Sequence, residues 1–170
     1  NNTFATSDVE ILNSTISSNT DVGIRVASAT PDFTGLLIDG CTVSSNGTYG
    51  FVSNPSQDNL NINTGFVIRN SAFTGNNTLG GGANHIMFFG SFSGTATISN
   101  VDITADTRAY GIVFNGAKNA GDTWPAAGNI VMNDLVFNGT IDKSSIYFYR
   151  YSTLANVSMT DVDMSGLASL

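Results

Sequence analysis

The chain has 170 residues, with 13 acidic and 6 basic side chains, a formal net charge of −7 and only 11% charged residues. So few cations argue against binding to nucleic acid or to an anionic membrane surface, because both need clustered Lys and Arg. The single cysteine, Cys41, excludes an internal disulfide and is expected to be buried, and no apolar run approaches the length of a membrane-spanning helix.

A six-residue pattern recurs along the chain. It opens with Ile or Met, has Asn, Asp or Gly at its third position, and closes with an apolar residue. The copies are ILNSTI from Ile11, IDGCTV from Ile38, IRNSAF from Ile68, ISNVDI from Ile98, MNDLVF from Met132 and MTDVDM from Met159. Because these copies start 27 to 34 residues apart, the chain is built from similar stacked units.

A second short block follows each of the first five copies. The blocks are GIRV from Gly23, GFVS from Gly50, HIMF from His85, GIVF from Gly111 and SIYF from Ser145. Alternation and β-branched or aromatic residues predict short strands in both blocks, with turn residues between them. The alternation predicts an inward column that starts at Ile24 and a second inward column that ends in a stack of phenylalanines at Phe88, Phe114 and Phe148.

The third position of the repeat predicts a bend. Asn, Asp and Gly are the residues that best tolerate a positive φ, and one such residue between two strands turns the chain sharply. The first and fourth positions can then both point inward. Successive copies would stack the asparagines at this position into a hydrogen-bonded ladder.

These features are typical of a right-handed parallel β-helix. Over about residues 9–166 the chain resembles the parallel β-helix repeat of pectate-lyase-like proteins, phage tailspikes and surface adhesins. The resemblance implies an all-β solenoid of about five to six coils with three short strands each. A β-sandwich and a leucine-rich repeat are the alternatives. A β-sandwich does not require the same residue types in register at six places, and the Leu-rich spacing of a leucine-rich repeat is missing. We expect residues 1–170 to be one domain, cut from a longer protein, with coil ends that attract a protein partner or further copies.

The outward positions of the second block form an unexpectedly apolar stripe. Its residues are Val52, Met87, Val113 and Tyr147. Either loops of the same chain cover this stripe, or another chain packs on it as an interface.

Three carboxylates gather near the third position of the last two copies, at Asp134, Asp161 and Asp163. Such a group predicts either a calcium site or a structural turn ladder, and we expect no other cofactor. Asp39 and Arg69 fall in neighbouring copies and predict an exposed ion pair.

The connecting segments hold the aromatic residues Trp124, Tyr149 and Tyr151, whose ring faces could stack on sugars. Loops on a rigid scaffold commonly bind ligands. We therefore expect a non-enzymatic shaft or adhesin of the extracellular space, cell surface or virion, with a polysaccharide or surface glycan as a possible ligand. The alternative is a polysaccharide lyase, hydrolase or epimerase that acts through Asp residues in a groove. The catalytic signatures of pectate lyases and polygalacturonases are absent from the sequence, and Glu10 is its only glutamate.

Overall fold

The computed structural model describes residues 9–26, 35–53, 61–62, 65–79, 84–89, 91–105, 110–116, 126–141, 143–149 and 153–168. All regular elements among these residues are β-strands. The strands are β1 (Val9–Leu12), β2 (Thr15–Ser17), β3 (Val22–Val26), β4 (Leu36–Asp39), β5 (Thr42–Ser44), β6 (Tyr49–Ser53), β7 (Asn61–Ile62), β8 (Gly65–Thr74), β9 (Asn84–Phe89), β10 (Ser91–Ala105), β11 (Tyr110–Asn115), β12 (Ala126–Gly139), β13 (Ile146–Tyr149) and β14 (Thr153–Leu167).

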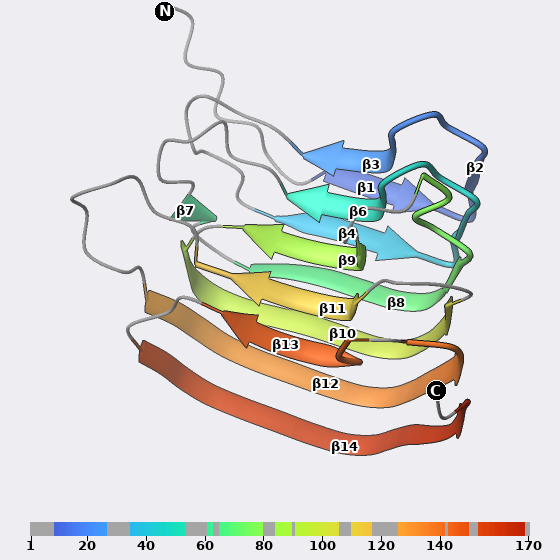
Figure 1. The fold of residues 1–170 in the computed structure, drawn as a ribbon. Helices are drawn as coiled ribbons and strands as arrows, with labels where there is room; N and C mark the ends of the chain where they lie inside the picture. The colour runs from blue at the N-terminus through green and yellow to red at the C-terminus, as the bar shows by residue number, and fades with distance from the viewer. Residues whose placement is uncertain are drawn as a thin grey trace, which may run out of the picture.

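The strands stack in rows and form two sheets, which makes the protein a parallel β-solenoid. The larger sheet runs in the order β1-β4-β8-β10-β12-β14, with β2, β5 and β7 beside that path. The smaller sheet runs β13-β11-β9-β6-β3 and lies in front of the larger one in Figure 1. Every pair of strands is parallel, whereas a β-sandwich is built from antiparallel pairs. The predicted all-β solenoid is therefore confirmed.

The bend at the third position of each repeat is present in every copy. All six residues at that position have φ in the left-handed region, although only one of them is a glycine. They are Asn13 (47°), Gly40 (66°), Asn70 (50°), Asn100 (50°), Asp134 (53°) and Asp161 (51°). The short polar side chains of Asn and Asp tolerate this conformation, so the sequence places the corner without needing glycine each time.

Two details of the rows differ from the prediction. The structure contains about four turns, fewer than the expected five to six. Three separate strands per row occur only in the first two rows. From β8 onward the chain stays paired on both sides of the bend, so one long bent strand replaces two short ones.

The core lies between the two sheets and is made of columns of matching residues. Strand register places Ile24, Phe51, Ile86, Ile112 and Ile146 in one column, as the alternation predicts. In the neighbouring column the rings of Phe88 and Phe114 stack with centroids 5.1 Å apart, and those of Phe114 and Phe148 with centroids 5.3 Å apart. Such stacking adds to the hydrophobic stabilisation of a buried aromatic column.

Candidate functional site

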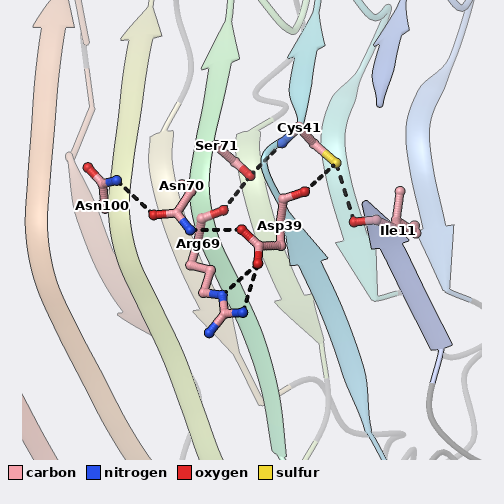
Figure 2. Close-up of polar contacts among 7 residues, drawn as sticks. All are labelled: Ile11, Asp39, Cys41, Arg69, Asn70, Ser71 and Asn100. Atoms are coloured by element: carbon pink, nitrogen blue, oxygen red, sulfur yellow. Dashed lines mark hydrogen bonds and ion pairs between the residues drawn. The ribbon is translucent and has the colours of Figure 1, made fainter. Parts of the chain in front are cut away.

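Polar side chains at the bend of the larger sheet are linked in a chain of hydrogen bonds across three rows (Figure 2). The Asn100 Nδ2 donates to Asn70 Oδ1, and the Asn70 Nδ2 donates to Asp39 Oδ1, both at 2.8 Å. Arg69 donates through Nε to Asp39 Oδ2, also at 2.8 Å. These bonds hold four side chains in fixed orientations on the surface, and they confirm the predicted Asp39–Arg69 ion pair.

The same contacts set the charge state of Asp39. The hydrogen bond from Asn70, followed by that from Arg69, lowers the pKa of this carboxyl below its ordinary value of 3.8. Donors aimed at the ionised form favour that form. Asp39 is therefore a fixed negative end of the ladder and is poorly suited to donating a proton.

Cys41 lies beneath this ladder and belongs to the structure of the bend. It is 2% exposed, and its backbone N–H donates to Ser71 Oγ at 3.0 Å. The Ser71 hydroxyl in turn donates to the carbonyl of Arg69 at 2.7 Å. The cysteine is thus a buried small residue, as expected from the sequence.

A shallow polar depression of about 240 Å³ opens beside the ladder. It is lined by Gly40, Cys41, Thr42, Asn70, Ser71, Ala72, Asn100 and Asp102. Gly40 occupies the bend position that carries Asn or Asp in the other five copies. A Cβ atom at Gly40 would collide with the Asn13 side-chain oxygen, so glycine interrupts the ladder at this row and allows Asn13 to lie close.

Two of the three acidic residues in the last rows accept local hydrogen bonds. Asp134 accepts a hydrogen bond from Asn133 Nδ2 at 2.7 Å, and Asp163 accepts one from the Ser165 backbone N–H at 2.8 Å. The latter bond lowers the pKa of Asp163. Among the described residues, no group of three His, Cys, Asp or Glu side chains lies close enough to hold a metal ion.

Tyrosines form a stacked group on the outer face of the smaller sheet. The ring of Tyr147 lies between those of Tyr110 and Tyr149, with centroids 5.1 Å and 5.6 Å apart and nearly parallel planes. Lys143 Nζ lies 5.1 Å from the centroid of the Tyr110 ring. Tyr149 is 36% exposed. The other two aromatic candidates, Trp124 and Tyr151, lie outside the described residues.

Three of the four residues of the predicted apolar stripe are buried. Val52, Met87 and Val113 stack in register but are only 1%, 7% and 3% exposed, and they form a second apolar cluster outside the main core. Val22, Tyr49, Tyr110 and Tyr147 pack against them. Burial raises the pKa of Tyr49, with a smaller contribution from the Asp21 carboxylate. Side chains this deeply buried offer little surface to another protein.

A second asparagine ladder, inside the solenoid, was not anticipated. Asn46 and Asn76 are 0% and 1% exposed. The Asn19 Nδ2 donates to Asn46 Oδ1 and the Asn46 Nδ2 donates to Asn76 Oδ1, both at 2.8 Å. The sequence does contain a trace of it, since each of these asparagines follows its bend residue by six positions in the first three copies.

No protein-family model matches the chain, and neither curated proteins nor solved structures provide a match. No helix in the portion covered by the structure is long and apolar enough to cross a membrane. The structure accordingly assigns the chain to the parallel β-solenoid fold and to no particular family.

Proposed function

We propose that this chain is a non-enzymatic module of the right-handed parallel β-helix superfamily. It serves as a stiff shaft or adhesin on a cell surface, on a virion or in the extracellular space, and it binds glycans at the tyrosine group around Tyr149. The observation that carries the proposal is the stack of Tyr110, Tyr147 and Tyr149 on the smaller sheet.

Several properties of this group suit it to sugar binding. Aromatic rings pair with the apolar faces of sugar rings and keep a hydroxyl for hydrogen bonding. Tyr147 and Tyr149 belong to β13, whose register is fixed by β11, so their positions are set by a strand. A site on a rigid element loses little conformational entropy when a ligand binds.

The pKa shifts of two carboxyl groups support binding more than catalysis. A general acid that works near neutral pH needs a raised pKa. The pKa shifts of Asp39 and Asp163 are both downward. Asp39 therefore links its row to the next one, Asp163 stabilises its own row, and the two do not form the acid–base pair of a glycosidase.

A glycan array probed with the purified chain, with Ca²⁺ present and with EDTA, tests the proposal. We expect the parent to bind a glycan. Tyr149→Ala should weaken this binding roughly fivefold, since an aromatic contact is worth about 1 kcal/mol, and Tyr149→Phe should retain it. Leu79→Ala shortens a side chain that is 68% exposed and far from Tyr149 in the sequence. This variant is the control and should bind normally. An array without hits, or equal binding by Tyr149→Ala, would contradict the proposal. Cleavage of a bound glycan would show an enzyme instead.

A further inference from the structure

A regular array of small side chains lies on the outer surface of the larger sheet, just after the bend. We name it the hydroxyl face. Its residues are Thr15, Ser17, Thr42, Ser44, Ala72, Thr74 and Thr104. They are the outward positions of β2, β5 and the corresponding segments of β8 and β10, so the face spans four successive rows.

Strand register makes the array periodic in two directions. Along the stack, Thr15 pairs with Thr42, and a second column runs unbroken through Ser17, Ser44, Thr74 and Thr104. Neighbouring rows of a sheet are about 4.8 Å apart, and two residues along a strand span about 6.6 Å. The side chains therefore mark a two-dimensional grid with these two repeats.

The hydroxyl groups of this grid point to solvent and are not used by the protein. Thr15, Ser17, Thr42 and Thr74 are exposed, and the other three residues are half-buried. None of the six hydroxyls makes a side-chain hydrogen bond to another described residue. Threonine also has few χ1 choices, so the hydroxyls are held in place by the backbone grid and by their own rotamers.

The hydroxyl face carries no charged side chain, and one of its columns ends next to a carboxylate. None of its seven residues is ionisable, and the column of Thr15, Thr42 and Ala72 stops at the exposed carboxylate of Asp102. A neutral surface of hydroxyls and methyl groups does not attract ions, and it does not hold water as tightly as charged groups do. Such a surface suits a neutral ligand that is rich in hydrogen-bonding groups.

We propose that the hydroxyl face binds ice. Each hydroxyl holds a water molecule at hydrogen-bond distance, so the grid of hydroxyls orders a layer of water with its own two repeats. The surface of an ice crystal is also a periodic layer of water. The water layer on the protein can join this ice surface at many points simultaneously. A dissolved molecule does not repeat in two directions and would engage only a few of these positions. The rigid parallel stack supplies the preorganisation that weak, repeated contacts need.

Ice-affinity partitioning and thermal hysteresis of the purified chain test this assignment. We expect the parent to be incorporated into growing ice and to show hysteresis, and Thr42→Lys/Thr74→Lys to lose both. Thr78→Lys adds one lysine at an exposed threonine in a turn outside the grid, and it should behave like the parent. Thr74→Ser, which keeps a hydroxyl, should retain most of the effect.

Circular dichroism melting of each variant separates loss of binding from loss of fold. The assignment is overturned if the parent is excluded from ice, or if a folded Thr42→Lys/Thr74→Lys variant still partitions into ice. It is also overturned if the parent instead binds microcrystalline cellulose through the same residues. Glycan binding at Tyr149 is measured separately, because Tyr149 lies on the smaller sheet, so none of these outcomes bears on it.

Discussion

At the scale of single residues, the two asparagine ladders have opposite roles. The ladder through Asn70 and Asn100 is exposed at the bend and can exchange its hydrogen bonds with water. The ladder through Asn46 is buried, so each amide there depends on its neighbour in the next row. A buried polar group without a bonding partner costs far more than an exposed one.

Asn46→Ala should accordingly destabilise the protein by about 1–3 kcal/mol, because it removes the side-chain bonds to Asn19, Asn76 and the Ile16 carbonyl. The Asn76 side-chain oxygen then keeps only its bond from the backbone N–H of residue 46. Chemical denaturation at pH 7 measures the change in the free energy of unfolding. Asn156→Ala removes an exposed bond to Asn129 and should cost much less. Equal losses in the two variants would show that the buried ladder has no special role.

The lowered pKa of Asp39 predicts a pH-dependent contribution to stability. A carboxyl whose pKa is lower in the folded state stabilises the fold above its ordinary value of 3.8, and this contribution is lost as pH falls through the folded-state pKa. Asp39→Asn should therefore unfold more easily than the parent at pH 7, and the difference should shrink as the pH falls below 3.8.

Urea unfolding at both ends of that pH range measures this effect. Asp102→Asn, at an exposed carboxylate that forms no ion pair with a described residue, is the control. If the free energy of unfolding differs by the same amount between Asp39→Asn and the parent at both pH values, the ladder bonds to the ionised carboxylate are not the cause of the difference.

At the scale of elements, the smaller sheet begins each row at a crowded corner. In three of its five strands the second residue is a glycine at which a side chain would meet packed neighbours, namely Gly23, Gly50 and Gly111. A Cβ at Gly111 would collide with the backbone carbonyl oxygen of Ser145 and the ring of Phe137. Because both neighbours belong to packed rows, they have little freedom to move away.

Gly111→Ala should thus cost about 1–3 kcal/mol through overpacking. Thermal melting, with the free energy of unfolding taken at the parent's midpoint, measures the cost. Ser145→Ala is the matched control, since this position in the next row already carries a Cβ and should change little. A Gly111→Ala protein as stable as the parent would indicate that the corner relaxes.

The elements that follow from local chemistry were predictable from sequence. The left-handed bend depends on the residue at one position, so the recurrence of Asn, Asp and Gly was enough to place all six corners. The columns of Ile24 and Phe88 follow from alternation once those corners are aligned. The fusion of two short strands into β8 was not predictable, because it depends on whether pairing continues through the bend in both neighbouring rows.

At the scale of the whole molecule, burial could not be predicted in the same way. Alternation places Val52, Met87 and Val113 on the outer face of their strands, yet these residues are buried. Their burial depends on side chains such as Tyr49 and Tyr110 that lie outside the repeat pattern. The tyrosine stack has the same origin, since Tyr110 and Tyr147 come from different rows and only the fold brings them together.

The parallel stacking also has a mechanical consequence. Hydrogen bonds between strands run along the stack, so a pulling force applied at its two ends passes through every row in series. The rows differ in strength: β1, β2 and β3 have 4, 3 and 5 residues, whereas β10 has 15 and β12 has 14. The second row is equally short, since β4, β5 and β6 also have 4, 3 and 5 residues. Under tension these first two rows are the weakest links, and they should peel away while the long strands of the later rows still carry the load.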